Sequence, residues 1–125
     1  MVKVIDGGAE LEESWSGKKL MRIKITAEVD GVRREYTITY GRYGRNNAAV
    51  SYATARADAP GGREKDAERL AALIKALTGR EPRIRRRSDG TIELVCDREH
   101  LDGFMRYTEL ADAIEKWLEE TSRRA

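Results

Sequence analysis

The sequence predicts an α+β fold in which helices cover one face of an antiparallel sheet, in the order ββ(β)αββα(α). Three observations lead to this prediction. Apolar and polar residues alternate on both sides of Asp30-Gly31, apolar residues recur at helical spacing between positions 67 and 77, and Ser88-Asp89-Gly90 separates two short apolar runs. We therefore expect two hairpins and an intervening helix within a single domain, residues 1–125.

The first hairpin has the clearest pattern. From Met21 to Val29 every second residue is apolar, which is typical of a strand with one buried face. Asp30-Gly31 suits a two-residue turn, because both central residues of such a turn take a positive φ. The return strand is expected over Val32 to Tyr40, with Arg34 at the margin and an inward set of Val32, Tyr36, Ile38 and Tyr40.

A third strand and a helix are expected next. Residues 48–55 follow a loop rich in Gly and Asn, and the strand is predicted to bury Val50 and Tyr52. A helix begins after Pro60-Gly61-Gly62, and Gly79 stands where a C-terminal cap is expected. Residues 1–18 are predicted to be an N-terminal arm or short strand that packs through Trp15.

The last third of the chain predicts a second hairpin and a helical end. The hairpin covers residues 83–95, with Ile84, Ile92 and Leu94 inward and the arginines at alternate positions outward. Asp97 suits an N-cap, and Thr108 suits the cap of a further helix that carries Trp117. Whether one or two helices follow Asp97 is left open, and residues 123–125 are expected to fray.

Composition limits the class of protein. Charged residues make up 37% of the chain and hydrophobic residues 40%, and the net charge is only +2. Glutamine is absent and Asn occurs only at Asn46 and Asn47, which is typical of proteins adapted to heat. No apolar run is long enough for a signal peptide or a membrane span, so we expect a cytoplasmic protein without membrane contact.

Catalytic and metal-binding chemistry is not predicted. The single cysteine, Cys96, and the single histidine, His100, are too few for a zinc site of the usual type. Cys96 is expected to be a small buried residue and His100 a surface residue. Nucleophile-elbow, dinucleotide-binding and Walker motifs are all missing, so no catalytic residue, metal or cofactor is assigned. Neighbouring acids such as Asp66 and Glu68 are expected to be solvated.

The basic residues predict a partner. If both hairpins join one sheet, the face opposite the helices is basic and contains threonines, and the loop 41–47 adds Arg, Tyr and Asn. Guanidinium groups on such a face suit the phosphates of DNA or RNA. The predicted nucleic-acid-binding residues are Arg22, Lys24, Arg33, Arg83, Arg85 and Arg87 on the sheet, with Arg42, Tyr43 and Arg45 in the loop.

Two other interpretations of the same features stay open. Glu28, Glu35 and Glu93 fall on the same face, so the arginines could serve cross-strand ion pairs only. The domain could also be an interaction module or homodimer that uses an open strand edge or the helix carrying Trp117 and Leu118. A metal-dependent nuclease would need acids gathered in space that the spacing does not reveal.

The order of elements resembles half of a LAGLIDADG homing endonuclease. The resemblance runs from Lys19 to Glu120 and is carried by Glu68–Leu77, Arg83–Leu94, Leu101-Asp102-Gly103-Phe104 and Tyr107. No acidic signature helix precedes the first long strand, and Lys75 and Leu77 stand where acids would be needed. The resemblance therefore implies a DNA-binding sheet without the nuclease.

A second resemblance covers most of the chain. Residues Ser14–Met21 and Ala55–Arg63 are similar to a crenarchaeal family of multicopy repeat-associated proteins of unknown function. This resemblance implies an archaeal origin, and it implies no activity.

Overall fold

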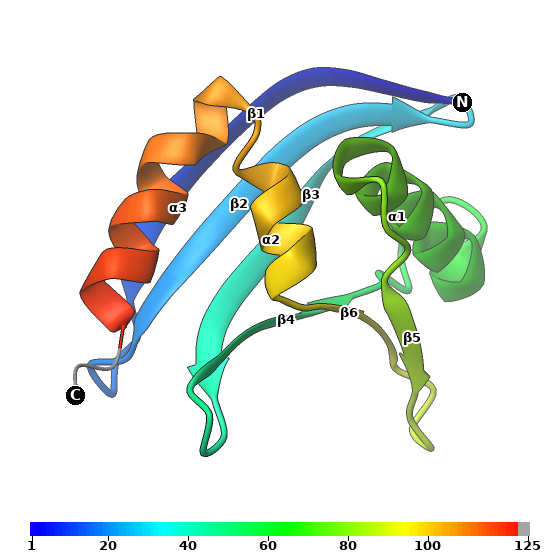
Figure 1. Cartoon of the computed structure of the whole chain (residues 1–125). Coiled ribbons are helices and arrows are strands. Elements are labelled where there is room, and N and C mark those ends of the chain that lie inside the picture. The colour runs from blue at the N-terminus through cyan, green and yellow to red at the C-terminus, as the bar shows by residue number, and fades with distance from the viewer. Residues whose placement is uncertain (123–125) are drawn as a thin grey trace.

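A computed structural model describes residues 1–122 and shows the predicted α+β fold (Figure 1). Residues 123–125, where fraying is expected, lie outside this range. The elements follow one another as β1 (Val2–Glu13), β2 (Lys19–Val29), β3 (Val32–Tyr43), β4 (Ala48–Thr54), α1 (Gly62–Thr78), β5 (Arg83–Arg86), β6 (Ile92–Cys96), α2 (Arg98–Phe104) and α3 (Thr108–Thr121).

The β2–β3 hairpin forms as its sequence predicts. Asp30 and Gly31 have φ values of 50° and 82°, and Val29 pairs with Val32 across the turn. Both strands then place alternate residues on the helix side, from Met21 to Val29 and from Tyr36 to Tyr40, and all of these are buried. Residues 1–18, predicted as an arm or short strand, instead supply a 12-residue strand, β1, along the edge of the sheet.

All six strands form one antiparallel sheet in the order β1-β2-β3-β4-β6-β5. Strands β3 and β4 pair only where Tyr40–Tyr43 meets Ala48–Ser51. Beyond that point β4 pairs with β6, while the first half of β3 stays with β2. Figure 1 shows the resulting divergence of β3 from β4, with α1 lying over it. The sheet therefore consists of two three-stranded halves joined at one end.

The three helices lie on one face of this sheet, as predicted (Figure 1). Asp97 caps α2 by accepting hydrogen bonds from the Glu99 and His100 backbone N–H groups. Two helices follow Asp97, because the chain turns at 105–107 before α3 begins. Residue Gly103 lets α2 approach α1, since a Cβ atom there would lie 2.7 Å from Thr78 Cβ. Within residues 1–122 no helix is long and apolar enough to cross a membrane.

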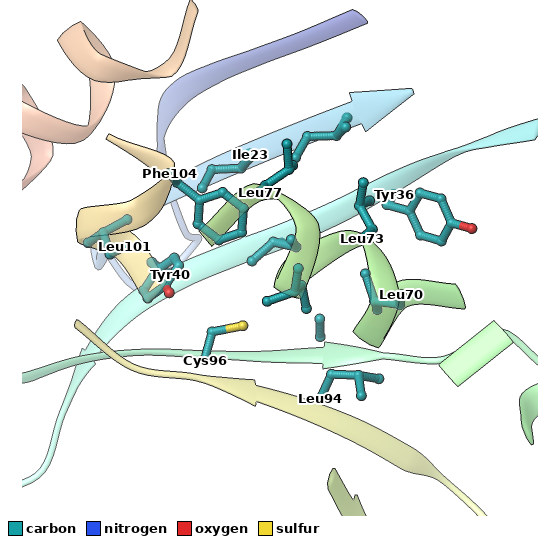
Figure 2. Packing of buried hydrophobic residues seen from close by; sticks show 14 of the residues in the cluster. Ile23, Tyr36, Tyr40, Leu70, Leu73, Leu77, Leu94, Cys96, Leu101 and Phe104 are labelled. Carbon is teal, nitrogen blue, oxygen red and sulfur yellow. The ribbon is translucent and has the colours of Figure 1, made fainter. Parts of the chain in front are cut away.

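The core fills the space between the helices and the sheet (Figure 2). Trp117 of α3 is fully buried and donates its indole N–H to the Lys19 carbonyl at 3.1 Å. The Tyr40 hydroxyl donates to the Asp97 carbonyl at 2.8 Å, so Trp117 and Tyr40 both have their polar atoms satisfied, whereas the buried Tyr36 hydroxyl has no hydrogen-bond partner within residues 1–122. Trp15, predicted to pack the N-terminal segment, is instead completely exposed in the β1–β2 turn.

The inward assignment in β4 was wrong. In β4 the buried residues are Ala49, Ser51 and Ala53, whereas Val50 is half-buried and Tyr52 is 41% exposed. The register with β3 sets this outcome, because Ser51 lies opposite the inward residue Tyr40. Ile84 pairs with the buried Leu94 and shares its face, yet it is 50% exposed because β5 is an edge strand.

Candidate nucleic-acid interface

The face of the sheet opposite the helices is open along its whole width in residues 1–122. Alternation along each strand decides which side chains lie on it. Cross-strand register then arranges them in rows, such as Glu10–Arg22–Thr39 over β1, β2 and β3, and Tyr52–Val95–Arg83 over β4, β6 and β5. The predicted residues on this open face are Arg22, Lys24, Arg33, Tyr43, Arg83, Arg85 and Arg87.

The β5 end of the open face is strongly basic. Arg83, Arg85 and Arg87 share it with one carboxylate, that of Glu93 on β6. Glu93 lies 3.7 Å from Arg85 and 3.2 Å from Arg87, and its side chain is only 13% exposed. No ion pair to Arg83 is present among the described residues. This corner, which we call the arginine corner, therefore carries two more positive charges than negative ones.

The β1 end of the open face is balanced or acidic. Arg22 forms an ion pair with Glu12 at 2.7 Å, and Glu10 lies opposite Arg22 in the register. A hollow of about 370 Å³ beside Gly8 is lined by Asp6, Glu10 and Glu35 as well as by Arg22 and Lys24. Arg33 lies opposite Glu28. The predicted sheet residues thus fall into two groups, and only the arginine corner has a surplus of charge.

Arg42 lies on the helix side, away from the predicted interface. It is not a loop residue, because β3 continues to Tyr43. Its guanidinium donates hydrogen bonds to Thr121 Oγ1 at 3.0 Å and to the Asn47 carbonyl at 3.0 Å, and it lies 5.0 Å from the Trp117 ring centroid. Burial lowers the pKa of Arg42. Arg42 therefore ties the end of α3 to the sheet, while Arg45 lies exposed in the β3–β4 turn.

An aromatic pair occupies the middle of the open face. The rings of Tyr43 and Tyr52 meet edge to face with centroids 5.6 Å apart. Lys18 places its ammonium 3.8 Å from the Tyr43 ring centroid. Gly41 makes room for this ring, since a Cβ atom there would lie 3.0 Å from the Tyr43 hydroxyl. Sequence reasoning found Tyr43 but missed Tyr52 and Lys18.

The divergence of β3 from β4 leaves a second hollow beside this pair. Its volume is about 440 Å³, and its walls include Thr37 and Thr39 from β3 and Tyr52 and Thr54 from β4. These four residues face outward, whereas Leu70 of α1 closes the bottom. We call it the central hollow. It offers hydroxyl groups and an aromatic ring, and Arg34, Glu35 and Arg56 add charged groups to its walls.

Potential metal ligands are spread over residues 1–122 rather than clustered in one place. In the described part of the chain, no three His, Cys, Asp or Glu side chains gather so that they could hold a metal ion. Cys96 is buried as predicted, and burial, together with the charge of Asp97, raises the pKa of its thiol to about 12. A thiol with this pKa is protonated at neutral pH and is a poor nucleophile.

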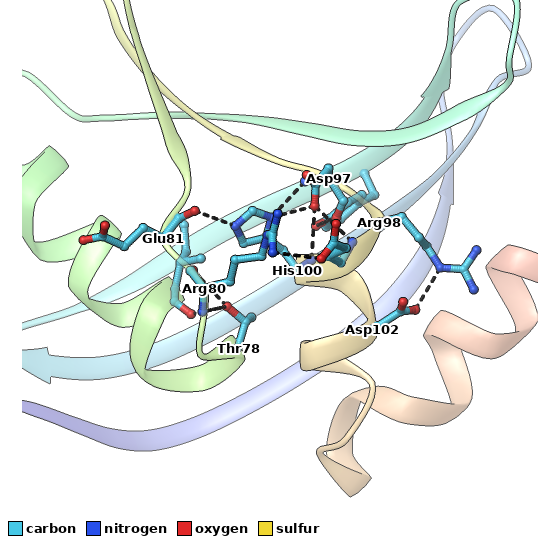
Figure 3. A network of polar contacts seen from close by, with 10 residues as sticks. Thr78, Arg80, Glu81, Asp97, Arg98, His100 and Asp102 are labelled. Carbon is cyan, nitrogen blue, oxygen red and sulfur yellow. Dashed lines mark hydrogen bonds and ion pairs between the residues drawn. The ribbon is translucent and has the colours of Figure 1, made fainter.

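His100 is buried and structural, so its assignment to the surface was wrong (Figure 3). Its Nδ1 atom accepts the Asp97 backbone N–H at 3.0 Å, which leaves Nε2 to donate to the Glu81 carbonyl, also at 3.0 Å. Burial alone would raise the pKa of Asp97, but the hydrogen bonds that its carboxylate accepts from the His100 and Glu99 backbone N–H groups hold it below its usual value. The network therefore joins α2 to the segment that follows α1.

Comparison with known proteins identifies a family. A family model described as PaRep2b protein matches residues 3–122, and the chain therefore belongs to this repeat-associated family. The match confirms the resemblance to repeat-associated proteins, and the family description names no activity. No curated protein and no solved structure matches the chain, so the resemblance to LAGLIDADG homing endonucleases has no support from known structures.

Proposed function

We propose that this member of the PaRep2b family is a non-catalytic nucleic-acid-binding domain that uses the open face of its sheet. The arginine corner is the observation that carries the proposal. Arg83, Arg85 and Arg87 are held in one row by strand pairing and by Glu93, and all three are exposed, Arg85 by 55% and Arg87 by 47%. A row of guanidinium forks at strand spacing suits consecutive phosphates.

Ion pairing alone accounts poorly for this corner. Glu93 neutralises at most one of the three arginines, whereas at the β1 end acids match the basic residues. A surface built only for cross-strand pairing would place acids opposite Arg83 as well, but Val95 occupies that position. We therefore assign the main phosphate contacts to Arg83, Arg85 and Arg87, and secondary contacts to Lys24, Arg33 and Arg45. A cytoplasmic location, which the sequence predicts, would give this face access to DNA and RNA.

The test is binding of labelled DNA and RNA across a salt series. If three phosphates are neutralised, a plot of log K against log salt has a slope of about −2 to −3. Arg83→Glu is the sharpest variant, because it breaks no ion pair of the described residues, and it should weaken binding and make the slope shallower by about 1. Arg106→Glu is the matched control, because Arg106 is exposed in the turn between α2 and α3, on the helix side of the sheet. This variant should change neither the affinity nor the slope beyond the effect of net charge.

The proposal fails if no DNA or RNA binds at low salt, or if Arg83→Glu and Arg106→Glu weaken binding equally. In the second case the protein attracts polyanions through net charge without a defined face. Addition of Mg²⁺ with analysis of strand length checks for cleavage, which the proposal does not expect.

A second candidate function, assembly of copies of this chain, is favoured by the charges of the two sheet edges. β1 carries Asp6, Glu10, Glu12 and Glu13 at one edge, and the β5 arginines lie at the other. Docking of β5 against the β1 of a second copy would continue the sheet and repeat without closing. The helix surface at Trp117 is not available for docking, because Trp117 is fully buried.

The bulge between Val4 and Asp6 disfavours such pairing, since bulges protect strand edges. Light scattering decides the matter. We expect a monomer at all protein concentrations, because the basic edge is assigned to nucleic acid. A mass that rises with protein concentration, together with no affinity for nucleic acid, would favour assembly instead.

A further inference from the structure

The geometry points to single-stranded nucleic acid as the ligand, with one base stacked on Tyr52 and the flanking phosphates bound by Lys18 and Arg83. This inference rests on the proposed function and specifies its ligand. It applies to single-stranded DNA and RNA alike, because ring stacking and phosphate pairing do not involve the 2′-hydroxyl. It starts from Tyr52, which the fold places on the open face rather than in the core.

Tyr52 has the position of a stacking platform. The residue is 41% exposed although it lies in a central strand, between the half-buried Val50 and the exposed Thr54 on the same face. Its hydroxyl makes no hydrogen bond to another part of residues 1–122. Tyr52 shares a row with Arg83, two strands away, which is about 10 Å at the usual strand spacing. An aromatic ring and a cation at this separation can bind a base and a nearby phosphate of one strand.

Tyr43 keeps the platform and the second cation in place. It meets the Tyr52 ring in an edge-to-face contact, lies against the Gly41 backbone and holds the Lys18 ammonium over its own ring. Lys18 reaches this place from the end of the β1–β2 turn, where its N–H donates to Ser14 Oγ at 3.1 Å. Cations therefore stand on both sides of Tyr52: Lys18 at the Tyr43 side and Arg83 at the β5 side.

Three features favour a single strand over a duplex. Bases in a duplex stack on one another, so their faces are not available to Tyr52, whereas an unpaired base exposes both faces. Within residues 1–122 all helices lie on the opposite face, so none can enter a groove of a duplex bound to the open face. The central hollow next to Tyr52, about 440 Å³ in volume and lined by Thr37, Thr39 and Thr54, has room for a neighbouring base.

The experiment compares four ligands in low salt: single-stranded DNA and RNA of about 15 nucleotides, a duplex of the same length, and inorganic polyphosphate of similar charge. The variants are Tyr52→Ala, Tyr52→Leu and Tyr52→Phe. Tyr52→Leu keeps apolar bulk and guards against a loss that comes from unfolding, and Tyr52→Phe keeps the ring. Thermal unfolding of each variant shows that it is folded.

We expect single-stranded DNA and RNA to bind within a few-fold of each other and at least about tenfold tighter than the duplex. Tyr52→Ala and Tyr52→Leu should each weaken single-strand binding by about tenfold or more. Tyr52→Phe should bind single strands as the unchanged protein does, and none of the three variants should alter the binding of polyphosphate. Equal binding of single strand and duplex, unaffected by Tyr52→Ala, would overturn the inference and leave the proposed function standing. No binding of any of the four ligands would overturn both.

Discussion

Asp66 lies near the start of α1 with no solvent-exposed surface, and both of its carboxylate oxygens are occupied. Arg34 donates to them in a bidentate pair at 2.8 and 2.7 Å, and the Arg56 backbone N–H donates at 2.8 Å. Its placement among solvated acids was therefore wrong. The partner explains the difference, because Arg34 sits at an inward position of β3 and requires an anion from the helix that covers it.

Replacing Asp66 and Asp58 in turn compares the contribution of a buried ion pair to stability with that of an exposed one. Asp66→Ala leaves the Arg34 guanidinium, which is 14% exposed, without its partner, and should lower the free energy of unfolding by about 3–5 kcal/mol. Asp58→Ala is the matched control: Asp58 also forms a bidentate pair, with Arg56, but is 72% exposed. Urea unfolding should show almost no change for this control. Similar losses in both variants would contradict the argument.

At the scale of elements, the sequence predicts best where an element depends on its own residues. The β2–β3 hairpin follows from strict alternation and from a turn whose φ values Asp30 and Gly31 can adopt. Helix α1 follows from its apolar spacing and ends at Gly79, which has a φ of 77°. The cap of α2 follows from Asp97. Each of these features depends on residues that are close in sequence, so tertiary contacts did not change them.

Faces of short strands depend on partners instead. β4 has apolar residues on both of its faces, and the face with the larger side chains, Val50 and Tyr52, was predicted to point inward. The structure reverses this, because the register with β3 sets Ser51 opposite the inward residue Tyr40 and so turns Ala49, Ser51 and Ala53 toward the helices. No property of residues 48–54 alone carries that information.

The candidate site was predictable to the same extent. Arg83, Arg85 and Arg87 were placed correctly, because alternation around Ile92 and Leu94 fixes the face of their hairpin. The alternation of β3 continues past Gly41. It places Arg42 on the same face as Tyr40 and places Tyr43 on the opposite, open face, so the sequence pattern could have distinguished the two residues. Lys18 gave no such signal, since its contact with Tyr43 joins the β1–β2 turn to the end of β3, which is distant in sequence.

For the molecule as a whole, a net charge of +2 hides a gradient across the sheet. Acids gather on β1, basic residues gather on β5, and the uncharged residues of β4 lie between them. A bound polyanion is repelled from the β1 edge and attracted to the arginine corner. Under the proposed function this gradient would orient the bound nucleic acid, and a count of charges for the whole chain does not reveal it.

Charge also bears on resistance to heat. The described surface carries many ion pairs, such as Arg80–Glu99 and Arg98–Asp102, each at 2.8 Å. Such pairs contribute more as temperature rises, because the cost of desolvating charged groups falls. We predict a midpoint of thermal unfolding above about 65 °C, the upper end of the mesophilic range.

Salt tests whether the ion pairs are responsible. At about 1 M NaCl the screening length falls to about 3 Å, so exposed pairs weaken while the buried Arg34–Asp66 pair does not. Calorimetry should then show the midpoint lowered by about 5 °C relative to low salt. KCl at the same concentration is the control, and equal shifts in the two salts identify screening rather than binding of a particular ion. A midpoint that stays constant or rises with salt would show that the dense surface charge contributes nothing to the stability of the fold.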